Sequence, residues 1–185
     1  SVIVTASVLE WVMLILSGIV VYLCVLPFTS SVLPDFLSSF WIMIIFLGLG
    51  ALFLYPPMLR LILKLLGKES EVTSLGYVSL LKGVLIYGIV WCGGGVMLYI
   101  ISQSLYISPF DNIPTAVGIW VLSGLFATVL FALVPGFGAK EVTLSILLGY
   151  FIPSPLNVAV AILTRFLQIF FDIIWGILLS FLLRR

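Results

Sequence analysis

The sequence predicts an all-α fold: a polytopic integral membrane helix bundle with a broken-helix hairpin at Pro135–Glu141. Of the 185 residues, 63% are hydrophobic and 8% are charged, whereas soluble domains carry about 25% charged residues. The hydrophobic residues form runs close to the ~20 residues that a membrane-spanning helix needs. One long apolar stretch is interrupted by a proline and two glycines between Pro135 and Gly138. One helix should therefore end there and another begin.

Loops rich in proline, glycine or charged residues separate the apolar runs. Pro56-Pro57 ends the second run because proline cannot continue the helical hydrogen-bond ladder, and Pro153 and Pro155 form a turn before the last run. We expect helices at about Val8 to Leu26, Phe36 or Phe40 to Tyr55, Leu75 to Ser102, Ile113 to Val134, the shorter stretch Val142 to Phe151, and Leu156 to Leu183.

A short basic segment, Met58 to Lys68, lies between the second and third runs. Arg60, Lys64 and Lys68 recur every four residues, so they share one face of a helix whose other face is Leu and Ile. This pattern predicts an interfacial amphipathic helix over residues 58–68, lying in the headgroup layer. We interpret it as a plain cytoplasmic anchor in preference to a site for anionic lipid.

The distribution of Lys and Arg predicts the orientation of the chain. The loops around Asp35 and Asp111 contain no basic residue, whereas residues 60–68 and Arg184-Arg185 are basic and should be cytoplasmic. From a cytoplasmic N-terminus, three spans end outside near Asp111, and the last span must start outside. Residues 113–151 should therefore leave the outer side and return to it, as a hairpin within a multi-pass protein of the cell membrane.

Several small or polar residues lie inside the apolar runs. Cys24 and Cys92 are expected to be buried thiols and not a disulfide or a metal pair. Glu10 lies near the start of the first run, where we expect a solvated carboxylate at a helix N-terminus. The third run contains glycines that allow close packing of a neighbouring helix or, as the alternative, a kink: Gly83, Gly88 and Gly93-Gly94-Gly95.

Residues Pro135 to Glu141, which we call the elbow, form a candidate anion site. A helix that begins after them has free backbone N–H groups and a positive dipole end, and Lys140 adds a cation. The residues predicted to hold an anionic headgroup are Pro135, Gly136, Gly138, Lys140 and Glu141.

The last apolar run carries a second set of candidate residues. Arg165, Gln168 and Asp172 share one helical face, which Asn157 continues toward the helix start. A charged residue at mid-bilayer costs about 2.5–3.5 kcal/mol and normally pairs inside the bundle. We expect Arg165 to pair with Glu141 or with Asp172. The four residues form either a structural lock between helices or the wall of a polar path, and the sequence leaves both open.

The elbow resembles a known motif. Pro135-Gly136-x-Gly138-x-Lys140-Glu141, followed by an apolar helix, a proline turn and Arg165, is similar to the transmembrane, flippase-like region of lysylphosphatidylglycerol synthase and its stand-alone membrane relatives. The family motif is Pro-Gly-Gly-x-Gly-x-Arg-Glu, so Phe137 and Lys140 depart from it, and Lys140 keeps the charge without the bidentate donor of arginine. The resemblance implies that residues 1–185 are one transmembrane domain, the C-terminal part of a longer one.

The resemblance also implies a function, namely binding and translocation of a phospholipid or lipid-linked headgroup. One alternative is a polyprenyl-phosphate-dependent sugar transferase, with Glu141 and Asp172 as its only candidate acidic residues. Another is a structural membrane subunit without transport, whose polar groups would all be paired internally. A non-enzyme is favoured. We expect no metal, no cofactor and, at a net charge of +1, no nucleic-acid partner. The oligomeric state is open, with a homo-oligomer as one alternative.

Overall fold

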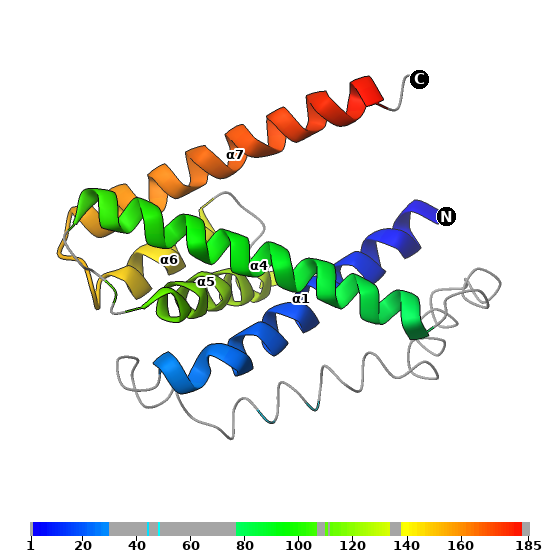
Figure 1. Cartoon of the computed structure of the whole chain (residues 1–185), viewed down its shortest axis with the longest axis horizontal. Helices are drawn as coiled ribbons and strands as arrows, with labels where there is room; N and C mark the ends of the chain where they lie inside the picture. The colour runs from blue at the N-terminus through cyan, green and yellow to red at the C-terminus, as the bar shows by residue number, and fades with distance from the viewer. Residues whose placement is uncertain are drawn as a thin grey trace. The chain divides into compact units, whose positions relative to one another are not determined.

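The computed structural model describes residues 2–29, 44, 48, 77–106, 110, 112–133 and 138–182. In these ranges the elements with defined bounds are all α-helices, as predicted (Figure 1). They are α1 (Val2–Thr29), α4 (Tyr77–Leu105), α5 (Ile113–Leu133), α6 (Ala139–Leu148) and α7 (Leu156–Leu182). The second expected span and the 58–68 amphipathic helix lie outside the described residues.

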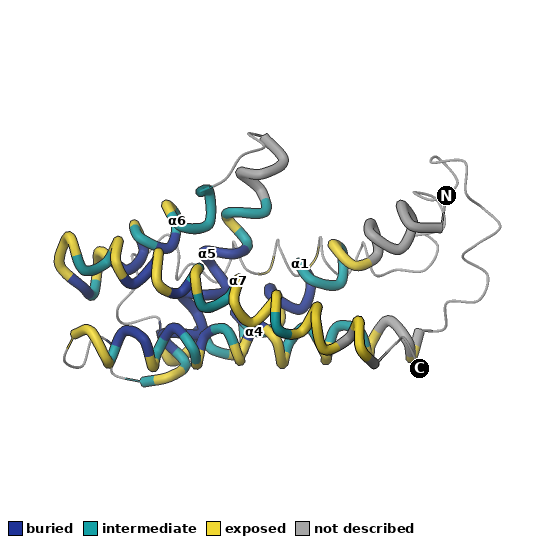
Figure 2. The backbone as a smooth tube through the Cα atoms, turned by 90° about the horizontal axis from the view of Figure 1, so that it is seen from above, coloured by how far each residue is buried: buried dark blue, intermediate teal, exposed yellow. Residues whose placement is uncertain are grey.

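Three of the described helices are long and apolar enough to cross a membrane: Glu10–Thr29 of α1, Leu81–Leu105 of α4 and Leu156–Leu178 of α7. Their large apolar side chains are widely exposed, and Ile89 and Phe166 are 72% and 67% exposed. Figure 2 shows long exposed stretches on α4 and α7. Apolar side chains on the outside are what a helix surrounded by lipid requires.

The chain forms two compact units, Ser1–Gly95 and Val96–Arg185. The boundary falls within α4, which remains helical through the three consecutive glycines Gly93–Gly95. The single transmembrane domain expected over residues 1–185 stays a prediction.

In the first unit, α1 and α4 run parallel to each other. The Tyr87 hydroxyl donates a hydrogen bond to Glu10 Oε1 over 3.1 Å, and one turn later Trp91 Nε1 donates to the Leu14 carbonyl over 3.0 Å. Both partners advance by four residues from the first bond to the second, so the helix directions agree. Gly83 packs closely against Met13, because a Cβ at Gly83 would collide with the Met13 sulfur. The close packing predicted for this glycine is confirmed.

Helix α1 differs from its prediction at both ends. It begins at Val2, so Glu10 lies two turns inside the helix and its carboxylate is held by Tyr87 instead of capping an N-terminus. The helix also continues past Pro27 to Thr29. The Thr29 hydroxyl donates to the Leu26 carbonyl over 3.1 Å, which satisfies one of the last carbonyls.

Cys24 and Cys92 are both free thiols, but both are exposed, so the prediction that they are buried is wrong. An apolar run indicates burial in a soluble protein. In a helix suited to lipid, the same run is compatible with a surface that faces hydrocarbon.

In the second unit, α5 and α6 form the predicted hairpin. Phe110, just before α5, stacks edge-to-face on Phe151, just after α6, with ring centroids 5.3 Å apart. The chain therefore returns to the place from which it left, and α6 is antiparallel to α5. Helix α7 packs on α6 in the opposite direction again, because Asn157 Nδ2 donates to the Ser145 carbonyl while the later Arg165 contacts the earlier Glu141. α5 and α7 are therefore parallel.

Candidate functional site

The candidate site begins where α6 begins. Gly138 has φ 112° and ψ −11°, a left-handed conformation that favours glycine, and its carbonyl accepts the first helical hydrogen bond from the Val142 N–H over 2.8 Å. Helix α5 has ended at Leu133, so the predicted break is confirmed. Pro135 and Gly136 lie outside the described residues, and their predicted role in headgroup binding stays a prediction.

Lys140, in the first turn of α6, has two contacts with neutral groups. Its Nζ lies 3.7 Å from the centroid of the Trp120 ring on α5, a cation–π distance. The same Nζ donates to Gln168 Oε1 on α7 over 3.5 Å, a long and weak hydrogen bond. Among the described residues, no carboxylate lies within ion-pair distance of this ammonium.

Glu141, the next residue, has the ionic partner that Lys140 lacks. Its Oε1 lies 3.0 Å from Arg165 Nε on α7, which confirms the predicted pair between α6 and α7. The Glu141 side chain is 26% exposed and the Arg165 side chain 37%. The ion pair therefore lies at the edge of the helix packing, not in its interior.

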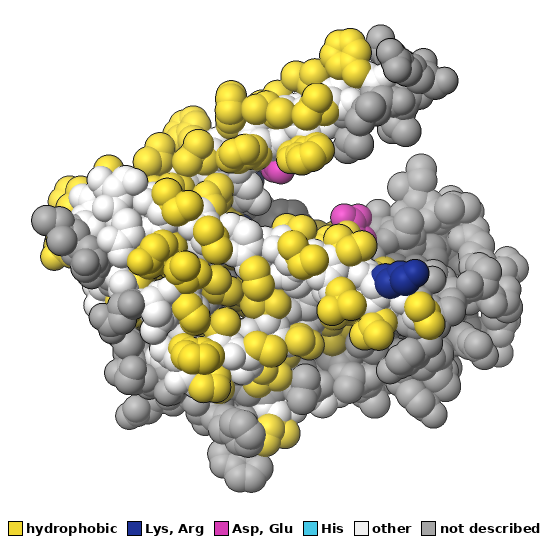
Figure 3. All heavy atoms as spheres, viewed as in Figure 1, with side chains coloured by type: hydrophobic (Ala, Val, Ile, Leu, Met, Phe, Trp, Pro, Cys, Tyr) yellow, Lys and Arg dark blue, Asp and Glu magenta, His cyan; other side chains and the backbone are white. Residues whose placement is uncertain are grey.

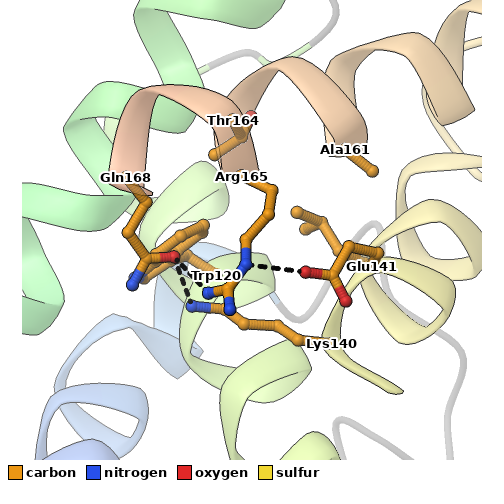
Figure 4. A pocket seen from close by; sticks show the side chains of 8 residues that line it. Trp120, Lys140, Glu141, Ala161, Thr164, Arg165 and Gln168 are labelled. Carbon is orange, nitrogen blue, oxygen red and sulfur yellow. Dashed lines mark hydrogen bonds and ion pairs between the residues drawn. The ribbon is translucent and has the colours of Figure 1, made fainter. Parts of the chain in front are cut away.

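Gln168 connects the two cations. Its Oε1 also accepts a bond from Arg165 Nη1 over 3.3 Å, so one amide oxygen serves both Lys140 and Arg165 (Figure 4). We call Trp120, Lys140, Glu141, Arg165 and Gln168 the Lys140 cluster. It holds two cations and a single carboxylate, and its formal charge is therefore +1.

The Lys140 cluster surrounds a small hollow, which Leu144, Ala161 and Thr164 complete. The side chains of Lys140, Arg165 and Gln168 point toward one another across it (Figure 4). Its free volume is about 10 Å³, roughly the space that one water molecule needs. The hollow is therefore too small to enclose a phosphate group in this arrangement.

The structure separates the predicted polar path into two parts. Arg165 and Gln168 line the hollow, but Asn157 and Asp172 do not. Asn157 instead binds the Ser145 carbonyl near the end of α6, over 3.1 Å, so it fastens α7 to α6 away from the cluster. Asp172 lies one turn beyond Gln168 with an exposed side chain, and the alternative Arg165–Asp172 pair is not formed.

Trp120 is the residue of the cluster that the sequence interpretation missed. It lies in the middle of an apolar run and is 5% exposed, as any core residue of α5 would be. Hydropathy cannot reveal that its ring faces an ammonium. The predicted hairpin could have indicated this contact, because Trp120 and Lys140 lie on its two facing helices.

The described residues hold no group of three or more His, Cys, Asp and Glu side chains suited to a metal ion. Comparisons with protein-family models, curated proteins and solved structures found no match to this chain. The resemblance to the lysylphosphatidylglycerol synthase region therefore stays a prediction.

Proposed function

We propose that the protein is a multi-pass protein of the cell membrane that binds an anionic phospholipid or lipid-linked headgroup at the Lys140 cluster and translocates it. The observation that carries the proposal is the unmatched cation. Lys140 is held by an aromatic ring and an amide oxygen, while the carboxylate beside it is paired with Arg165. Among the described residues no carboxylate lies within ion-pair distance of this ammonium, and in an apolar setting such a cation attracts an anion, because low dielectric strengthens that attraction.

The depth of the cluster supports a ligand that reaches it within the bilayer. The 10 residues of α6 cover roughly 15 Å, about half of the ~30 Å hydrocarbon core. Arg165 lies nine residues after Leu156, the first residue of α7, or roughly 14 Å along its axis. With the base of the hairpin at the outer interface, both helices bring their charged groups to about the same middle depth.

The directions of the helices support the expected topology. Two parallel helices that both cross a membrane must be joined by a segment that crosses back. For the parallel pair α1 and α4 we therefore propose a return crossing in residues 30–76, where we predict the second span. The parallel pair α5 and α7 requires α6 to return toward the start of α5, as the Phe110–Phe151 contact supports.

Translocation, as distinct from binding, is supported by the resemblance of the elbow to a flippase-like region and by a site at middle depth. A structural subunit without transport is the second candidate. One observation favours it: the Arg165–Glu141 pair and the shared Gln168 oxygen already satisfy much of the cluster. The translocase and the structural subunit differ in the role of Lys140, which binds the headgroup only in the translocase.

The binding experiment is the Lys140→Ala substitution, titrated in detergent with short-chain phosphatidylglycerol and, for comparison, with zwitterionic phosphatidylcholine. A hydrogen bond to a charged group contributes about 1.5–3 kcal/mol, so we expect an approximately tenfold or greater rise in the Kd for phosphatidylglycerol. Lys82→Ala is the matched control, since Lys82 is an exposed lysine of α4.

The same variants in proteoliposomes test transport. Flip of headgroup-labelled phosphatidylglycerol should exceed that of empty liposomes with the wild type and Lys82→Ala, and fall with Lys140→Ala. Equal binding by Lys140→Ala and the wild type would exclude the headgroup role and leave the structural subunit.

A further inference from the structure

The hollow inside the Lys140 cluster is too small for the ligand that its charge favours. Its free volume of about 10 Å³ fits one water molecule, and a phosphate group is several times larger. A phosphate group can therefore be enclosed beside Lys140 only if part of the lining moves.

Most of the lining is fixed by packing. Trp120, Leu144, Ala161 and Thr164 are between 0% and 5% exposed. The Thr164 hydroxyl is also bonded to the Val160 carbonyl over 2.6 Å. Moving any of these side chains would open space in the packed contacts between helices, which is costly.

The Glu141–Arg165 pair is the part that can move. Both side chains are long and partly exposed, at 26% and 37%, and a single 3.0 Å contact is the ion pair that joins them. Inside a bilayer this pair does not separate by itself, because unpaired charges there are costly. Its opening therefore requires an anion that takes the place of the carboxylate on Arg165, and this exchange leaves the packed side chains of the lining in place. Once Glu141 swings away, the guanidinium of Arg165 presents donors toward the hollow beside Lys140.

We propose that Glu141 is an internal competitor: its carboxylate occupies the place on Arg165 that the phosphate of an anionic lipid takes when it binds. The proposal rests on the proposed function and assigns Glu141 a role opposite to headgroup binding. The bound phosphodiester would lie between Lys140 and Arg165, and its single negative charge would offset the +1 charge of the cluster. Arginine suits this exchange because its fork binds carboxylate and phosphate with the same geometry.

The surroundings of the pair indicate that the phosphodiester belongs to a lipid and not to a soluble ion. Ile162 and Ile169 lie three residues before and four residues after Arg165, hence on its face of α7, and Val142 follows Glu141 on α6. These three side chains are 41% to 59% exposed. Apolar side chains cover α7 on the face seen in Figure 3. A ligand that displaces Glu141 from this side meets apolar surface first, which suits acyl chains.

Glu141→Gln tests the proposal, because it removes the charge that competes for Arg165 and keeps the shape of the side chain. We expect the Kd of the full chain for short-chain phosphatidylglycerol to fall about fivefold or more, because even a water-exposed ion pair contributes up to about 1 kcal/mol, which is about fivefold in Kd, and a lipid-facing pair is stronger. Asp172→Asn makes the same change of charge one turn beyond Gln168 without touching the pair, so its gain should be clearly smaller. Glu10→Gln, in the other unit, should leave the Kd unchanged.

Inorganic phosphate and glycerol 3-phosphate distinguish the source of the phosphate. Neither should displace the short-chain lipid at concentrations that saturate the site with lipid. Efficient displacement by either would overturn the lipid assignment. A Kd for Glu141→Gln that is unchanged, raised or no lower than that of Asp172→Asn would overturn the competitor role.

The two proposals fail in different ways. Binding that depends on Lys140 but weakens in Glu141→Gln would leave the proposed function standing and reject the competitor. Binding that does not depend on Lys140 would reject the proposed function first. If Glu141→Gln does not fold, Glu141→Asp serves instead. Its shorter side chain keeps the charge but strains the 3.0 Å contact with Arg165, so the affinity for phosphatidylglycerol should rise by a smaller factor. No rise in affinity would overturn the competitor role.

Discussion

At the scale of single residues, side chains that look alike in the sequence have different tasks. Trp91 and Trp120 both lie in apolar helices and are 8% and 5% exposed. Trp91 donates its indole N–H to a carbonyl of α1, whereas Trp120 offers its ring face to Lys140. The group that each ring contacts in the folded chain decides whether its N–H or its ring face is used.

Trp91→Phe should therefore destabilise the contact between α1 and α4 modestly. The substitution keeps an aromatic ring but loses the hydrogen bond to Leu14, worth about 0.5–1.5 kcal/mol. We expect the lower end of that range, because the Ser17 hydroxyl also donates to the Leu14 carbonyl and leaves it satisfied. Thermal unfolding in detergent measures the change, with Trp175→Phe, an exposed tryptophan of α7, as the control. The role of Trp91 is contradicted if both variants melt at the same temperature.

At the scale of helices, the sequence predicted positions well where local chemistry sets the ends. The expected Leu75–Ser102, Ile113–Val134 and Leu156–Leu183 lie within three residues of α4, α5 and α7 at each end. Loops rich in polar residues, glycine or proline bound these runs, so hydropathy and backbone chemistry agree. α1 was predicted less well, because the expected bounds Val8 to Leu26 followed the apolar run, whereas the helix begins at Val2 and continues past Pro27 to Thr29.

The contacts inside the candidate site were likewise predictable only in part. From the sequence, the partner of Arg165 could be narrowed to Glu141 or Asp172, because unpaired charges in apolar helices must find partners, and the structure shows Glu141. The Gln168 oxygen shared by Lys140 and Arg165, and the position of Asn157 away from the cluster, could not be predicted. They depend on the angle at which α7 crosses α6, and no local sequence pattern encodes that angle.

Gly138→Ala tests the start of α6. At φ 112° an added Cβ is strained, and we expect a loss of about 1–2 kcal/mol in stability. Gly93→Ala is the matched control, because Gly93 lies inside α4 and an added Cβ there meets nothing within 4 Å. Alanine is the better helix former by about 1 kcal/mol, so Gly93→Ala should be neutral or stabilising. Melting temperatures in detergent that change equally for both variants would contradict the special role of Gly138.

At the scale of the whole molecule, the apolar surface and the paired helix directions support the topology that we propose. In it, a span in α1, a return crossing and a span in α4 would bring the chain to the outer side. The α5–α6 hairpin would then start and end there, and α7 would return to the cytoplasm. The Lys140 cluster lies between the hairpin and α7, so in this topology a ligand bound there would be about midway between the two surfaces.

Cysteine labelling checks this topology in intact cells. Cys24 and Cys92 are exposed and lie inside the candidate spans Glu10–Thr29 and Leu81–Leu105. A membrane-impermeant maleimide should not reach them until detergent is added, because their surroundings are hydrocarbon.

In a background with both changed to Ser, Ser104→Cys at the end of α4 and Ser154→Cys in the turn before α7 should both react from outside. These two positions are exposed and flank the hairpin. Reaction of Cys24 or Cys92 without detergent would contradict their placement in lipid, and reaction of the two new cysteines from opposite sides would contradict a hairpin that returns to the surface it left.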